Sequence, residues 1–229
     1  MSKLKSIAII CFAVNTILVS QYKITDKDNR SSMGWDLSVG IGYNNVSIPG
    51  AFTGIDADGG SSFNGRIGFY YLVNDLLKLK FGFQKWSKIY IEYDDIHDNT
   101  LGDGLLTIES EFSYYGIYLE ILKEGTVGFF GGGLEFSVSK DLSISSISAF
   151  DDEAPPDFVK QAEDIFKQRI FHQADVYFIA GLFIVNNEKL LFSPYVRLGV
   201  PTISLYDTGS TASIAAFYFS AGLNAEISF

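Results

Sequence analysis

The stretch that decides the fold is AFYFSAGLNAEISF, residues 216–229, with which the sequence ends. Every second residue counted back from the last one is apolar, and the residues between them are polar, small or amphipathic. The apolar positions are Phe229, Ile227, Ala225, Leu223, Ala221, Phe219, Phe217 and Ala215. Because successive side chains of a β-strand point to opposite faces, this period of two predicts a strand with one apolar face.

The same alternation recurs along the sequence and predicts an all-β protein. Eight strands are expected, approximately at 33–46, 62–73, 77–93, 105–122, 127–139, 173–186, 190–204 and 213–229. The connections alternate between short turns at 74–76, 123–126 and 187–189 and long loops at 47–61, 94–104, 140–172 and 205–212. An even number of antiparallel strands with short turns at one end and long loops at the other predicts an up-and-down transmembrane β-barrel. Both chain ends then lie on the periplasmic side.

The two faces of the predicted strands differ in character. One face is continuously large and apolar, as in Trp35, Leu37 and Val39, and the other is small or charged. Eight strands enclose only enough room for side chains, so the polar face is expected inside and the apolar face in lipid. Some outward positions do not fit, namely Lys85, Ser87, Glu109, Glu111 and Ser113. Either these stretches project above the bilayer, or a bulge shifts the alternation.

The N-terminus predicts export. Lys3 and Lys5 precede a mostly apolar run at 7–19, and Ser20 offers a cleavage point, so residues 1–20 are expected to be a secretory signal peptide. A membrane anchor is the alternative, but the run is shorter than the roughly 20 residues that span a bilayer as a helix. Residues 21–32 are then a periplasmic lead-in and 33–229 the barrel. The only cysteine, Cys11, lies in the signal, so the mature chain has no disulfide.

The amino-acid composition supports a β-rich protein and argues against a nucleic-acid-binding protein. Twenty Phe, 13 Tyr and 22 Gly with only 5 Pro are typical of a β-rich protein. The 17 Lys and Arg against 27 Asp and Glu give a formal net charge of −10. Nucleic-acid binding requires clustered basic residues that neutralise phosphates, so no nucleic-acid partner is expected. No cofactor is implied, and we expect a monomer.

Taken from signal to terminal Phe229, the sequence resembles the small outer-membrane barrels: the OmpA transmembrane domain, OmpX/Ail, and the porin-like or PorT-like barrels of the Bacteroidetes. Its ending, SAGLNAEISF, resembles the C-terminal signal that delivers such barrels to their assembly machinery, with its apolar positions at Phe217, Phe219, Leu223, Ile227 and Phe229. The resemblance implies an outer-membrane location, with outer-membrane lipids and the assembly machinery as partners. It implies no activity, because a fold does not carry function.

Charged residues on the inward face form the first candidate site. They are Asp36, Arg66, Lys78, Lys80, Glu120, Glu135, Asp175, Arg197 and Glu226. Arg66, Glu135 and Arg197 are expected to meet near mid-barrel, and Lys78 and Lys80 to lie level with Glu120. A gated ion path is one interpretation. The favoured one is a structural plug, because charges in a narrow lumen must be paired and a packed eight-stranded interior leaves no continuous water channel.

The long loops hold two further candidates. Asp94, Asp95, Asp98 and Asp103 could offer hard oxygen ligands to Ca²⁺, although their spacing does not match the helix-loop-helix calcium signature. The simpler interpretation is a solvated acidic loop. After Pro155 and Pro156, the apolar residues recur at helical spacing, which predicts a short helix with Phe158, Ile165, Phe166 and Ile170 on one face. That face is either a docking surface for an extracellular partner or lipid headgroup, or the underside of a lid on the barrel.

Catalysis is not expected. His97 and His172 are the only histidines, and neither has Ser and acid partners at an interpretable spacing. The sequence therefore predicts a structural or surface-interaction role with a plugged lumen. The alternatives are a narrow pore or hydrophobic-solute conduit, a lipid-modifying outer-membrane enzyme, and a soluble lipocalin-like barrel with inward aromatic side chains.

Overall fold

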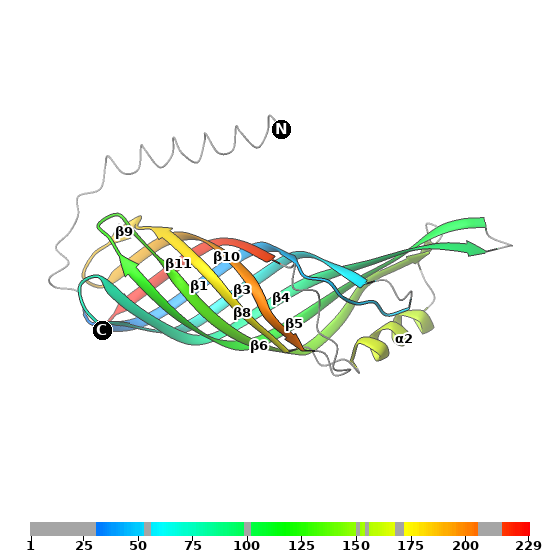
Figure 1. The fold of residues 1–229 in the computed structure, drawn as a ribbon, viewed down its shortest axis with the longest axis horizontal. Coiled ribbons are helices and arrows are strands. Elements are labelled where there is room, and N and C mark those ends of the chain that lie inside the picture. Colours follow the sequence, from blue (N-terminus) through cyan, green and yellow to red (C-terminus); the bar gives the residue numbers. More distant parts are fainter. Residues whose placement is uncertain are drawn as a thin grey trace, which may run out of the picture.

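Eight long antiparallel strands form a closed ring in the computed structural model (Figure 1), which describes residues 31–52, 56–98, 102–149, 152–153, 156–167, 172–205 and 217–229. The strands are β1 (Met33–Asn45), β3 (Asp56–Leu72), β4 (Leu77–Asp98), β5 (Gly102–Glu124), β6 (Gly128–Ala149), β8 (His172–Leu182), β10 (Leu190–Leu205) and β11 (Phe217–Ser228). The ring closes because β1 pairs with both β3 and β11. The predicted eight-stranded barrel is confirmed. The predicted signal, 1–20, and nearly all of the lead-in lie outside the described residues.

Four short elements complete the chain order. Strand β2 (Ile48–Pro49) pairs with β3, β7 (Asp152–Glu153) with β6, and β9 (Val185–Asn186) with β10. Helix α2 (Pro156–Lys167) is the predicted loop helix, and it begins at a proline, whose fixed φ suits the first turn. Within the described ranges, no helix is long and apolar enough to cross a membrane.

Two of the tight turns are held by an asparagine side chain. Asn74 Oδ1 accepts hydrogen bonds from the backbone N–H groups of Leu76 and Leu77, at 3.0 and 2.9 Å. Asn187 Oδ1 accepts from Lys189 and Leu190 in the same way, at 3.1 and 2.8 Å. An asparagine that caps its own turn fixes the register of the strands on either side.

The long loop predicted at 94–104 is instead mostly strand. Strands β4 and β5 pair continuously out to Asp98 and Gly102, and Figure 1 shows this hairpin projecting beyond the rest of the barrel. The acidic residues there have low strand propensity, which favoured a loop in the sequence. Pairing between two long strands overrides such a preference, because strand propensity depends on context.

The outward charges of β5 do not come from a bulge in that strand. Strand β5 keeps its alternation throughout, because the extra residues of the bulges fall in its partner: Ser113 and Tyr114 pair with Asp141 and Ser139, which leaves Lys140 unpaired. A further bulge lies in β3, where pairing with β4 jumps from Gly59 to Ser62. Since β5 does not shift its parity, Glu109 and Glu111 face outward near the loop end of the barrel.

The exterior of the barrel is a belt of exposed apolar side chains. At the turn end, Trp35 packs on Phe69 with ring centroids 4.2 Å apart, and its ring lies 6.5 Å from that of Phe229. Further along lie Leu37, Val39, Ile41, Ile67, Phe83, Ile117, Leu119, Leu134, Phe136, Val176, Phe178, Leu198, Phe219 and Leu223, each more than a third exposed. The opposite parity is buried, so the predicted assignment of apolar outside and polar inside is confirmed.

Candidate functional site

The nine charged residues predicted to face inward are all buried, and all but Asp175 take part in ion pairs of the lumen. Nearest the short turns, Lys78 pairs with Glu124 and with Glu226 Oε2, the latter at 2.6 Å. Lys80 contacts Asp36 at 2.7 Å and Glu226 Oε1 at 2.8 Å. Glu226 thus bridges two ammonium groups that rise from the start of β4. This turn-side layer joins β1, β4, β5 and β11.

Mid-barrel, two arginines share one carboxylate. Arg66 contacts Glu120 and Glu135 at 2.6 Å each, and Arg197 contacts the same oxygen of Glu135 at 3.2 Å. The Tyr177 hydroxyl donates to Glu120 at 2.8 Å. Arg66, Glu135 and Arg197 therefore lie together, as expected, whereas Glu120 pairs with Arg66 and not with the lysine opposite it. The contacts of this mid-barrel layer cross the lumen between β3, β5, β6, β8 and β10.

Aromatic rings fill the space between these charges. The guanidinium carbons of Arg66 and Arg197 each lie 5.1 Å from the ring centroid of Tyr177. Arg197 is also 4.5 Å from the Trp86 ring, and Arg66 is 4.6 Å from the Tyr118 ring. Cations over aromatic faces are favourable and become more so when desolvated. The arginines are thus held by rings as well as by carboxylates.

Lys88 begins the loop-side layer and was missed in the sequence. Its Nζ donates to Gln173 Oε1 at 2.7 Å and lies 5.0 to 5.8 Å from three rings, those of Trp86, Tyr114 and Tyr218. Lys88 is an even number of residues from the inward Lys78 and Lys80, so its side chain points to the same face of β4. This spacing in the sequence could have identified it. Glu124 was missed because it was placed in a turn, although it shares the parity of Glu120.

Helix α2 packs against the inner wall at the loop end of the barrel. Phe166 is 1% exposed, and its ring stands edge-on to Phe112 on the inward face of β5, 5.6 Å away. Ala162 is fully buried in the same cluster, and Ile165 is half-buried. The Phe166 side of the helix is therefore covered by the protein's own barrel. The side chain of Phe158 and residue Ile170 lie outside the described residues.

An ion pair lies on the exposed face of α2. The Lys167 ammonium donates to Glu163 at 2.7 Å, one turn earlier, and this hydrogen bond raises the pKa of Lys167. Such a pair supports the helix weakly because water screens it.

The remaining candidates are the acidic residues of the β4–β5 hairpin and the two histidines. Asp94 is half-buried and Asp95 exposed on opposite faces of β4, and the side chains of Asp98 and Asp103 lie outside the described residues. Among the side chains that the structure describes, no three of His, Cys, Asp or Glu are grouped to hold a metal ion. His172 stacks on Phe136 with centroids 6.2 Å apart, while the side chain of His97 is among those not described.

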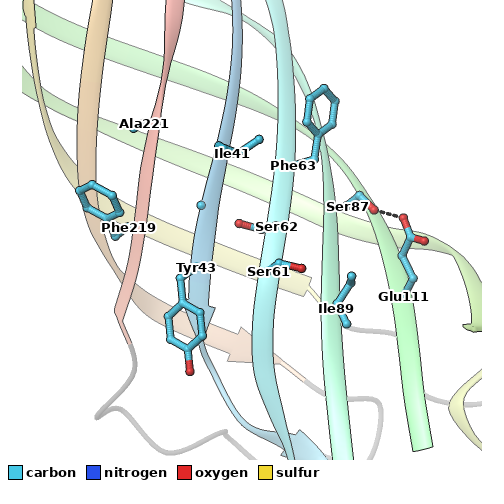
Figure 2. Close-up of a pocket in the computed structure, with 11 residues that line it drawn as sticks. Ile41, Tyr43, Ser61, Ser62, Phe63, Ser87, Ile89, Glu111, Phe219 and Ala221 are labelled. Carbon is cyan, nitrogen blue, oxygen red and sulfur yellow. Dashed lines mark hydrogen bonds between the residues drawn. The ribbon is translucent and has the colours of Figure 1, made fainter. Parts of the chain in front are cut away.

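The exterior wall has a hollow of about 690 Å³ near the loop end of the belt (Figure 2). It lies outside the lumen and is lined mainly by outward side chains of β1, β3, β4, β5 and β11: Ile41, Tyr43, Ser61, Phe63, Ser87, Ile89, Glu111, Phe219 and Ala221, with Gly42 and Ser62. Figure 2 shows the Ser87 hydroxyl hydrogen-bonded to the Glu111 carboxylate at one side of this exterior groove.

An eight-stranded antiparallel barrel with an apolar exterior and a polar interior has the organisation of the small outer-membrane barrels. No protein-family profile and no curated protein matches the sequence.

Three solved structures illustrate the likeness of fold. Neisserial surface protein A is 11% identical with a TM-score of 0.45, over 87% of this chain and 98% of that protein. The outer membrane protein OprG from Pseudomonas aeruginosa is 12% identical, with a TM-score of 0.44 over 89% and 100%. Ail, the attachment invasion locus protein of Yersinia pestis, solved with the heparin analogue sucrose octasulfate, is 12% identical, with a TM-score of 0.34 over 86% and 99%.

Proposed function

We propose that this chain is an outer-membrane barrel with a closed lumen and a structural or surface-interaction role. The observation that carries the proposal is the filled interior. The turn-side lysine network, the mid-barrel arginine layer and the loop-side aromatic layer under α2 follow one another along the lumen. We also propose that the chain is related to the OmpA, OmpX/Ail or Bacteroidetes small-barrel families.

The exterior supports membrane placement. Large apolar side chains exposed to this extent on one continuous surface require an apolar surrounding, which a bilayer provides. A lipocalin-like carrier would direct its bulky apolar side chains inward and its charges outward, which is the reverse of the arrangement here. A monomer needs no further partner to cover the belt, because lipid covers it.

The surface role is proposed from the β4–β5 hairpin. Both strands run far past the ends of β1 and β11, so the hairpin extends beyond the belt on the long-loop side (Figure 1). On a barrel whose lumen is filled, this projection is the part that could reach a partner outside the cell. No catalytic step enters the proposal, since no group of catalytic side chains has emerged in the described part of the chain.

Two measurements test the proposal. Expressing cells are fractionated, and the barrel is run unboiled and boiled on a gel; recovery in outer membranes with a mobility shift on boiling is expected. The purified protein in planar bilayers is then expected to give no conductance steps, while a conducting porin inserted under the same conditions does. Soluble periplasmic recovery would contradict the membrane placement, and discrete current steps would contradict the closed lumen.

A further inference from the structure

The outer wall changes from apolar to polar across β4, β5 and β6. Nearer the turns, the outward residues that pair across these strands are exposed and apolar: Phe83, Ile117 and Phe136. Nearer the loop end, the outward residues are polar: Ser87, Ser113 and Asp141, and beyond them Glu111 and Ser143. Between the two sets lies the pair Lys85 and Tyr115. Since the apolar band of a membrane barrel ends in aromatic residues at the headgroups, this pair marks the loop-side edge of the belt.

Two ammonium groups converge on the ring of Tyr115. The Nζ of Lys85 lies 5.5 Å from the ring centroid, and the Nζ of Lys140 lies 5.8 Å from it. Lys140 is the residue that the bulge in β6 leaves unpaired, and a bulge changes the direction of the side chains beside it. Both lysines are exposed, and neither forms an ion pair within the described ranges. Two positive charges from different strands therefore lie beside one outward aromatic ring.

The carboxylates on this wall do not neutralise both lysines. Asp141 lies at the same ring, where its Oδ2 accepts a hydrogen bond from the Tyr115 hydroxyl at 3.2 Å. Glu111 and Glu109 lie four and six residues beyond Tyr115 toward the loop end, which is roughly 13 and 20 Å along the strand. The rim cluster is defined as Lys85, Tyr115, Lys140 and Asp141. It carries two positive charges and one negative charge, which leaves a positive surplus at the edge of the belt.

We propose that the rim cluster binds a phosphate group of the glycolipid that forms the outer leaflet. A phosphate monoester carries a charge of about −1.5 to −2 and three acceptor oxygens, so it accepts hydrogen bonds from both ammonium groups at once. The acyl chains of the same lipid then lie against Phe83, Ile117 and Phe136 on the turn side of the cluster. A free phosphate ion gains no such apolar contact, and a headgroup without net negative charge gains nothing from two lysines. This inference rests on the membrane placement proposed above.

The test compares two glycolipids that differ only in phosphate. The full-length mature barrel is purified in an uncharged detergent and mixed with equal amounts of lipid A that keeps its phosphate groups and lipid A from which they have been removed. Native mass spectrometry then counts the lipids that stay on the released protein. We expect the phosphorylated form to be retained about five-fold more, as a charge-assisted hydrogen bond at an exposed site gives. Equal retention of the two forms would overturn the assignment.

Substitutions in the rim cluster locate the site. Lys85→Gln and Lys140→Gln are each expected to reduce the preference for the phosphorylated form to about two-fold, and the double variant to abolish it. Asp141→Asn removes a charge that repels phosphate and is expected to raise the preference about two-fold. An unchanged preference in the double variant would overturn the proposal, and so would a lower preference in Asp141→Asn.

Lys123→Gln is the matched control. Lys123 is also exposed on the outward face of β5, but it lies at the turn end of that strand, on the other side of the belt. This variant is expected to keep the wild-type preference for the phosphorylated form. An equal loss in Lys123→Gln and Lys140→Gln would show that net charge, and not the rim cluster, attracts the lipid, and it would overturn the proposal.

Failure of the membrane placement would be seen separately. A protein that stays in solution without detergent and does not enter vesicles would contradict the proposed function itself. Insertion into vesicles without selection of the phosphorylated glycolipid would overturn only the rim cluster. The substituted side chains are exposed on the outer wall, so every variant is expected to keep its mobility shift on boiling.

Discussion

Glu135 is the carboxylate that two arginines share in the centre of the lumen. Its Oε2 contacts both Arg66 and Arg197, and its side chain is 1% exposed. Glu135→Ala removes the carboxylate that contacts Arg197 and one of the two that contact Arg66, and breaking a buried pair typically costs about 3–5 kcal/mol. We expect the barrel in vesicles to unfold at a clearly lower urea concentration. The folded fraction at each urea concentration is measured from the mobility of unboiled samples on a gel.

The matched control for Glu135 is Glu163→Gln on α2. Glu163 also pairs with a basic residue, Lys167, but the side chains are 30% and 52% exposed. Because water already solvates an exposed pair, the unfolding midpoint is expected to stay unchanged. Equal effects of the two variants would show that the lumen pairs do not hold the barrel together.

Gly133 is a second position where one residue decides the packing. It lies opposite Tyr177 in the β6–β8 register, and a Cβ there would overlap the Tyr177 ring. Gly133→Ala is expected to displace that ring from between the two arginines, at a cost of about 1–3 kcal/mol as for other overpacked cores. Gly65→Ala is the control, since a Cβ at Gly65 meets nothing within 4 Å; a similar loss in both variants would contradict the prediction.

At the scale of elements, the buried side chains of Phe166 and Ala162 join α2 to the apolar cluster of the barrel. Phe166 packs edge-on against Phe112, so Phe166→Ala removes an aromatic contact between the helix and the inward face of β5. The strands keep their own pairing, and we expect the mobility shift on boiling to persist while proteinase K cleaves α2 several-fold faster. Asp164→Ala, on an exposed position of the same helix, is expected to leave cleavage unchanged. Unchanged cleavage of the Phe166 variant would mean that the helix is held elsewhere.

The sequence predicted elements best where alternation was regular. The faces of β1 and β11 follow the period-two pattern from Trp35 and Phe219 without interruption, and their assignment is confirmed. Prediction was weaker where pairing between distant residues determines the structure. The β4–β5 hairpin was predicted too short because its acidic stretch was interpreted as a loop, and the bulges in β3 and β6 have no signal in the local sequence. A bulge is a mismatch between two strands, so it is invisible in either strand alone.

The alternation along each strand predicted which residues face the lumen, but it did not predict which of them form ion pairs with one another. Lys80 and Glu120 are opposite each other in the β4–β5 register, and yet Lys80 pairs across the lumen with Asp36 and Glu226. Such pairs join strands that are far apart in sequence and depend on the size and curvature of the closed ring. The exterior groove was missed for the same reason, since five strands form it.

The belt and the projecting hairpin together define how the whole molecule sits in a bilayer. Leu134 on β6 and Leu105 on β5 are both about half exposed, at 56% and 48%. Leu134 lies in the middle of the belt, whereas Leu105 lies on the hairpin beyond it. Leu134 and Leu105 are therefore similar in type and exposure but differ in their proposed depth in the membrane.

An arginine placed at each of these positions tests that arrangement. A charge at the bilayer midplane costs about 2–4 kcal/mol on the lipid face of a barrel, and the cost falls to about 0–1 kcal/mol near the interfaces. Leu134→Arg is therefore expected to reduce the folded fraction in vesicles under denaturant strongly, and Leu105→Arg hardly at all. Both variants should behave alike in a detergent micelle that adapts to the charge. Equal costs in vesicles would mean that the bilayer does not contact the belt where Leu134 lies, and the membrane placement would have to be redrawn.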